Sequence, residues 1–143
     1  MPFRFLEDIT RADVAVEVVA ETVEELFAGA AEALLQIQIE DIESVQRRKR
    51  QTVKVSHDQM DLLLYRFLQE LIFLKDSERL LLRPERVTIT SNAHGNQLEA
   101  TLSGEPLDPA RHTQGVDAKA VTLHRFEVLQ TPAGWKATIV FDI

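Results

Sequence analysis

Carboxylates near both ends of the sequence are the groups best suited to chemistry. Valines alternate with other residues over residues 13–18, which predicts a half-buried strand with Asp13 on the face opposite the valines. The same alternation over residues 135–143 places Asp142 opposite the apolar side chains of a last strand, and the terminal carboxylate of Ile143 follows directly. If the two strands are neighbours, these anions converge and suit a hard divalent cation such as Ca²⁺ or Mg²⁺. Spacing alone favours three unrelated surface carboxylates, because acidic residues are normally exposed.

Other patterns that carry chemistry are weak or absent. The sequence has no glycine-rich phosphate loop, no Cys/His zinc spacing and no G-x-S-x-G motif. Single histidines favour solvated or turn positions over metal ligands, and the sequence scatters four of them: His57, His94, His112 and His124. The basic run 47–50 suits RNA phosphates, but so acidic a chain favours a solvated charge run that protects the following strand from edge pairing.

The composition predicts an acidic globular protein with a single domain over residues 1–143. Its 143 residues are 45% hydrophobic and 27% charged, which is enough for one sizeable core. A formal net charge of -7 disfavours sequence-independent DNA binding, because phosphate binding needs a basic surface. The absence of cysteine indicates a cytoplasmic location. We find neither a signal-peptide pattern nor an apolar run that could span a membrane.

Two amphipathic helices and several strands are expected to position these carboxylates. A Ser/Thr-x-x-Glu/Gln capping pattern opens each predicted helix, over residues 22–36 and 56–74. A two-proline loop over 105–112 is predicted outside any central strand, and a bulge is predicted at 124–125. Period-two alternation and turn residues predict strands over residues 14–18, 52–55, 80–82, 87–90, 97–102, 121–129 and 135–143. The expected fold class is α+β, with two helices packed on a mostly antiparallel β-sheet.

Four stretches of the sequence, taken together, resemble the archease family. The likeness runs almost end to end, and its most specific parts are a G-E-P-x-D-P loop, a K-A-V-T segment and a closing Asp-Ile, in that order. The four stretches are residues 5–8 with 12–14, residues 61–65 with 70–74, residues 104–109 with 119–124, and residues 134–135 with 140–143.

The resemblance implies an accessory protein rather than an enzyme. Archeases assist the GTP- and Mn²⁺-dependent RNA-splicing ligase of tRNA splicing and RNA repair, helping it to acquire its guanylyl group and to turn over many times. They do not join RNA themselves, so any RNA contact is indirect. The family likeness also implies a divalent-cation site, for Ca²⁺ or for Mg²⁺ or Mn²⁺, whose ligands match Asp13, Asp142 and Ile143. The resemblance therefore favours a cation site, whereas spacing alone favoured three unrelated surface carboxylates.

One segment departs from the family pattern. The familiar version carries His-Thr-Ala-Asp before the first strand, whereas residues 8–13 here are Asp-Ile-Thr-Arg-Ala-Asp, typical of a divergent bacterial branch. The metal and the identity of the ligase therefore stay open. Two alternative functions remain: a metal-dependent hydrolase in which the same carboxylates activate water, and a general protein chaperone.

Overall fold

The structure, a computed structural model, describes residues 2–6 and 13–143. None of the helices found in this part of the chain has the length and apolar character to cross a membrane. In chain order the described elements are β1 (Phe3–Leu6), β2 (Asp13–Ala20), α1 (Val23–Gln38), the 3-10 helix η1 (Ile42–Ser44), β3 (Lys49–His57), α2 (Met60–Glu78), β4 (Leu80–Asn92), β5 (Gly95–Pro106), β6 (Ala120–Thr131) and β7 (Gly134–Asp142).

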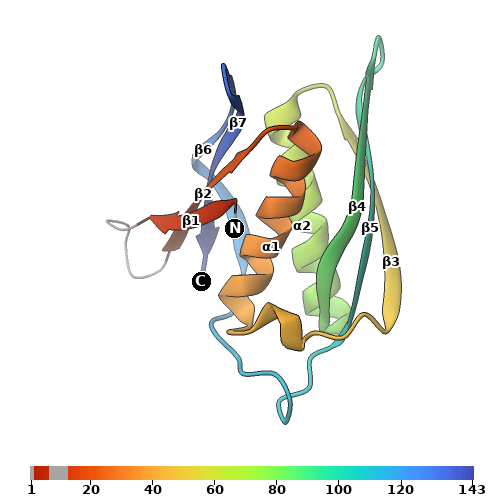
Figure 1. The fold of residues 1–143 in the computed structure, drawn as a ribbon, viewed down its shortest axis with the longest axis vertical. Coiled ribbons are helices and arrows are strands. Elements are labelled where there is room, and N and C mark those ends of the chain that lie inside the picture. The colour runs from red at the N-terminus through yellow and green to blue at the C-terminus, as the bar shows by residue number, and fades with distance from the viewer. Residues whose placement is uncertain (1, 7–12) are drawn as a thin grey trace.

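The strands form two antiparallel sheets with the two helices between them (Figure 1). One sheet has the order β1-β2-β7-β6, and the other has the order β3-β5-β4. α1 packs against β2 and β4, and α2 packs against β3 and β6, so each helix touches both sheets. The α+β class is confirmed, with the strands divided between two sheets. A helix pair covered on both sides explains why α2 is apolar over much more than one face.

The two predicted helix starts have different outcomes. α1 begins directly after Thr22, whose hydroxyl accepts a 3.1 Å hydrogen bond from the backbone N–H of Glu25, so this capping prediction is confirmed. α2 begins at Met60 rather than at Ser56, and that capping prediction is wrong. Ser56 belongs to β3, which pairs with β5 as far as His57, so strand pairing keeps this segment out of the helix.

The three-stranded sheet contains one long strand where two were predicted. β4 runs through both predicted segments, 80–82 and 87–90, with an irregular register next to Pro84. β5, the central strand, ends at Pro106, so the prediction that residues 105–112 lie outside any central strand is wrong for its first two residues. A proline is tolerated there because it is the last residue of the strand.

The core between the sheets fixes the registers of β2 and β7. The rings of Phe27 in α1 and Phe67 in α2 stack with their centroids 6.1 Å apart. Val16 of β2 and Phe141 of β7 are fully buried against this core, as the alternation of the two strands predicts. The predicted bulge in β6 is also confirmed, since the register shifts there and Arg125 has a φ of 58°. The register of β7 with its neighbours β2 and β6 is therefore fixed.

Candidate metal centre

Asp13 and Asp142 face each other across neighbouring strands. β2 pairs with β7 in antiparallel register, and Asp13 is the direct partner of Asp142. The condition set in the sequence analysis, that the strands carrying Asp13 and Asp142 are neighbours, is therefore met. Directly opposite residues share one face of a sheet, with Cβ atoms about 4.5–5.5 Å apart. Because the neighbouring pair, Val14 and Phe141, packs on the core, the two aspartates lie on the sheet face turned away from the helices.

The main chain holds Asp142 from both sides. On the side opposite β2, Asp142 pairs with Ala120 of β6, and its carbonyl oxygen accepts a 2.7 Å hydrogen bond from the N–H of Lys119. Ile143 follows directly, and its side chain packs against the main core. Such anchoring keeps the last residue next to Asp142.

The donor set of this group is made only of carboxylate oxygens. Two like charges placed directly opposite each other on adjacent strands repel, and a divalent cation between them would turn this repulsion into attraction. Oxygen-only ligands fit Ca²⁺, Mg²⁺ or Mn²⁺. Within residues 2–6 and 13–143, no group of three or more His, Cys, Asp or Glu side chains could hold a metal ion. A third ligand from the described chain would be the Ile143 carboxylate, while residues 8–12 of the family segment lie outside the described residues.

Glu17 lies on the same face of β2, and two basic side chains bind its carboxylate. The Arg4 guanidinium donates a 3.0 Å hydrogen bond to it, and the Lys136 ammonium lies 3.4 Å from its second oxygen. The hydrogen bond from Arg4, helped by Lys136, lowers the pKa of Glu17 below its ordinary value in spite of partial burial. Glu17 is therefore a structural carboxylate and a matched control for Asp13 and Asp142.

A second carboxylate site, around Glu105 of the G-E-P-x-D-P loop, was missed in the sequence. Glu105 is only 3% exposed. It accepts a 2.7 Å hydrogen bond from the backbone N–H of Gln46, and the Arg111 guanidinium and the His112 ring, 3.0 Å away, also bind it. The Arg48 guanidinium lies 3.7 Å from the same carboxylate. Burial raises the pKa of Glu105, but the donors from Gln46, His112 and Arg111 outweigh it, so the pKa is lowered and the carboxylate stays charged.

His112 lies at a bend of the chain, as the predicted turn position requires, but it is buried, so the alternative of a solvated side chain is wrong. Its Nδ1 accepts a 2.9 Å hydrogen bond from the backbone N–H of Asp108. A neutral ring with an accepting Nδ1 carries its proton on Nε2, which then donates to Glu105. The signal in the sequence is the pair of a glutamate and a histidine seven residues apart across two prolines. These contacts hold the loop in one conformation, and the groups that make them offer no exposed nucleophile.

The basic run 47–50 serves partly as structure. The Arg47 guanidinium donates to the Ser103 hydroxyl at 2.8 Å and to the Arg83 carbonyl at 3.3 Å. Arg48 donates to the Gln46 side chain at 2.7 Å. The run leads into β3, which is an edge strand of its sheet, as the predicted role against edge pairing requires.

Comparison with known proteins identifies the family. A model of the archease protein family matches residues 3–143. Protein archease of Pyrococcus abyssi is 34% identical over 133 residues, covering 92% of this chain and 93% of that protein. Protein archease of Thermococcus gammatolerans is 35% identical over the same shares of both chains. Protein archease of Methanopyrus kandleri is 30% identical over 143 residues, the whole of both chains.

Solved structures agree with this assignment. The solution structure of Methanobacterium thermoautotrophicum protein 1598 is similar with a TM-score of 0.86, 30% identity and coverage of 99% of both chains. The crystal structure of an archease from Thermotoga maritima, described as a possible chaperone, has a TM-score of 0.65 at 20% identity over 98% of both chains, which shows a shared fold. The resemblance found in the sequence is confirmed, and this chain belongs to the archease protein family.

Proposed function

We propose that this protein activates a GTP- and Mn²⁺-dependent RNA-splicing ligase, promoting its guanylylation and multiple turnover in tRNA splicing or RNA repair. The observation that carries the proposal is the pairing of Asp13 with Asp142 in a chain that belongs to the archease family. A divalent cation bound by these carboxylates, with that of Ile143, would supply positive charge that stabilises phosphate oxygens. The protein's own part is to hold the cation and to dock on the ligase.

The fold can hold charged side chains in fixed positions. β7 is paired on both sides and β2 is paired with β1 and β7, so neither aspartate rests on a loop. Ligands on rigid strands are placed more accurately than ligands on loops. Two mechanisms use this arrangement: the protein delivers a cation to the ligase, or its docking shifts the ligase between conformers.

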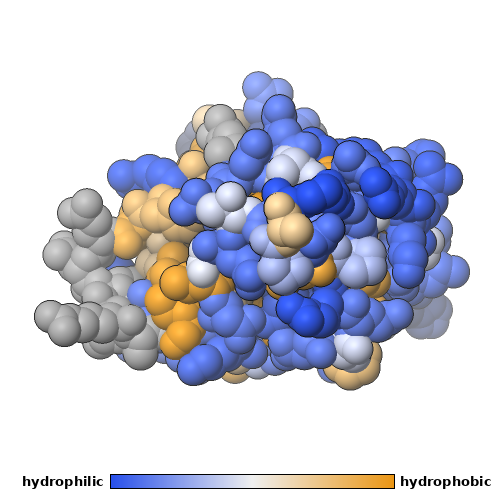
Figure 2. All heavy atoms as spheres, turned by 90° about the horizontal axis from the view of Figure 1, so that it is seen from below, coloured by the Kyte–Doolittle hydropathy of each residue, from blue (hydrophilic) through white to orange (hydrophobic). Residues whose placement is uncertain are grey.

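A general chaperone role finds less support. Large exposed apolar side chains come from five separate parts of the described chain: Phe5 in β1, Val19 in β2, Phe73 in α2, Val116 in a loop, and Leu123 and Leu129 in β6. Seen from below, hydrophilic residues cover most of the surface and hydrophobic residues gather at one side (Figure 2). A small apolar area within a mostly polar surface is normal for a folded protein, whereas holding unfolded chains needs a broad apolar patch.

The test of the proposal is a multiple-turnover RNA ligation assay. We expect the purified protein to raise the number of RNA joints made per ligase molecule, and to join no RNA and hydrolyse no nucleotide by itself. The assay would use RNA in large excess over ligase, with the protein added or withheld. Unchanged ligase turnover would rule out activation, and hydrolysis by the protein alone would favour the metal-dependent hydrolase.

The terminal carboxylate gives a separate prediction. Amidation of Ile143 removes its negative charge and keeps the side chain that packs on the core. We expect the affinity for Ca²⁺ or Mn²⁺ to fall about tenfold, because such sites are tuned by the number of charged ligands. The melting temperature without cation should stay the same. Titration calorimetry on semisynthetic free-acid and amidated chains makes the comparison, and equal affinities would reduce the ligand set to the two aspartates.

A further inference from the structure

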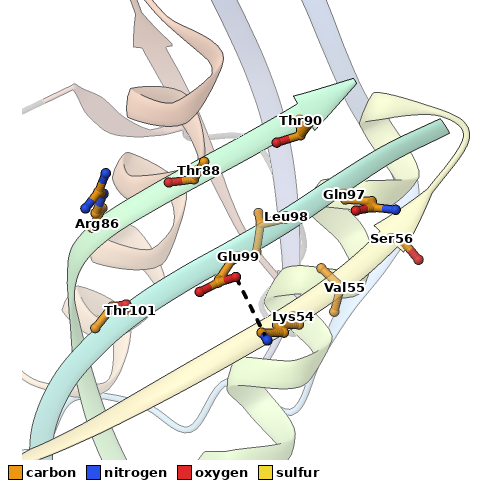
Figure 3. A pocket seen from close by; sticks show the side chains of 10 residues that line it. All are labelled: Lys54, Val55, Ser56, Arg86, Thr88, Thr90, Gln97, Leu98, Glu99 and Thr101. Carbon is orange, nitrogen blue, oxygen red and sulfur yellow. Dashed lines mark ion pairs between the residues drawn. The ribbon is translucent and has the colours of Figure 1, made fainter. Parts of the chain in front are cut away.

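The outer face of the sheet β3-β5-β4 carries an open hollow of ≈ 690 Å³, lined mostly by polar side chains, together with Val55 and Leu98. The helices lie behind the sheet, and the face towards the viewer carries hydroxyl groups and cations (Figure 3). Residues that contribute such groups are Lys54, Ser56, Arg86, Thr88, Thr90 and Thr101. A sheet face that is neither apolar nor covered is free to meet a polar partner.

The lining of this hollow carries a small excess of positive charge. It contains two cations, Lys54 and Arg86, and one carboxylate, Glu99, although the whole chain has a formal net charge of -7. The ion pair between Lys54 and Glu99 spans 4.0 Å, and its side chains are 72% and 61% exposed. Arg86 forms no ion pair with any residue that the structure describes. Exposed ion pairs are weak, so Lys54 can exchange a carboxylate for another anion.

The strand register arranges these groups in rows. Thr101 of the central strand lies between Thr52 and Arg86, and the next outward residue, Glu99, lies between Lys54 and Thr88. Outward residues recur about every 6.6 Å along a strand, and strands lie about 4.8 Å apart. Cations, hydroxyl groups and a carboxylate therefore alternate over a surface on the scale of a few nucleotides.

We propose that this face binds the phosphate–sugar backbone of an RNA strand. Lys54 and Arg86 would neutralise phosphates, the threonine hydroxyls would bind phosphate oxygens, and Glu99 would accept from a ribose 2′-hydroxyl. An acidic protein segment fits less well, because its carboxylates offer nothing to the acceptors on this face. None of the lining residues is aromatic, so bases are not stacked and binding is independent of sequence. The proposal goes beyond the ligase-activating role, for which RNA contact is indirect.

The test measures RNA binding by the protein alone, with EDTA present and no ligase. Fluorescence anisotropy with a labelled 20-nucleotide oligouridine should show binding that weakens with salt. For two phosphates neutralised on a single strand by Lys54 and Arg86, the logarithm of the association constant should fall against the logarithm of salt with a slope of about −1.4. The double variant Lys54→Gln/Arg86→Gln should lower this slope by about 1.4 and the affinity at 50 mM salt by about tenfold.

The matched control is Arg125→Gln/Lys136→Gln, which removes the same charge from the other sheet and should keep the wild-type affinity within about twofold. RNA-induced shifts of backbone amide resonances in β3, β4 and β5 of the wild-type protein should accompany binding. Absent salt-dependent binding, equal loss in the control variant, or shifts confined to other elements would overturn the proposal. Displacement of RNA by polyglutamate at equal charge would assign the face to acidic proteins instead. Failure of this test leaves ligase activation untouched, because no ligase is present.

Discussion

Replacing Asp142 with Asn is expected to lower the affinity for Mn²⁺ or Ca²⁺ by about 10- to 100-fold, because one of about three anionic ligands is lost. Asn has nearly the same size, and the backbone pairing of Asp142 with β2 and β6 does not involve the side chain. Asp13→Asn should have the same effect, since the two side chains face each other. Titration calorimetry on the wild type and both variants measures the change.

Thermal unfolding with and without cation tests the same binding site independently. Without cation, Asp142→Asn should be close to wild type in stability, because the backbone pairing of this residue is unchanged. At a cation concentration about 100 times the Kd, wild type should gain about 2.7 kcal/mol and the variant much less. Glu17→Gln, on the same face but bound to Arg4 and Lys136, should keep the wild-type cation affinity. Equal affinities for wild type and Asp142→Asn would exclude this side chain as a ligand.

The largest expected loss of stability follows replacement of Glu105 with Ala. The change leaves the guanidinium of Arg111, the Nε2–H of His112 and the backbone N–H of Gln46 without their acceptor. Removing one partner from a buried ion pair lowers the free energy of unfolding by about 3–5 kcal/mol. Urea unfolding at pH 7 measures the difference, and a loss below about 1 kcal/mol would show that water replaces the carboxylate.

Glu105 also gives the stability a defined dependence on pH. Its pKa is lowered in the folded protein, because the donors from Gln46, His112 and Arg111 outweigh burial. The stabilisation is therefore complete above the unfolded-state value, near 4.5, and is lost as the pH falls through the lower folded pKa. The difference in unfolding free energy between wild type and Glu105→Gln should shrink as the pH is lowered below about 4.5. A difference that stays constant down to pH 3 would contradict this account.

The alternation of side chains in two strands predicted which faces carry Asp13 and Asp142, whereas their assignment to a cation site came from the family resemblance. Val16 and Phe141 identify the buried faces of β2 and β7, and the faces with Asp13 and Asp142 follow from the two-residue period. Local signals also located the start of α1 at Thr22, because an N-cap depends on residues three apart in the sequence.

The parts that could not be predicted depend on contacts between distant segments. Ser56 has the local pattern of a helix cap, but its pairing with β5 makes it part of a strand. Glu105 accepts a backbone hydrogen bond from Gln46, 59 residues away, and two prolines make its segment look like an exposed loop. The division of the strands into two sheets, one on each side of the helix pair, likewise depends on contacts between distant segments.

We propose that this archease-family protein activates an RNA ligase through a cation held by Asp13 and Asp142. The most direct measurement is multiple-turnover RNA ligation at limiting ligase with wild type, Asp142→Asn and the control Glu17→Gln, each added at the same concentration. We expect wild type and Glu17→Gln to raise turnover equally, and Asp142→Asn to leave it near the level of the ligase alone. Equal stimulation by wild type and Asp142→Asn would contradict the claim.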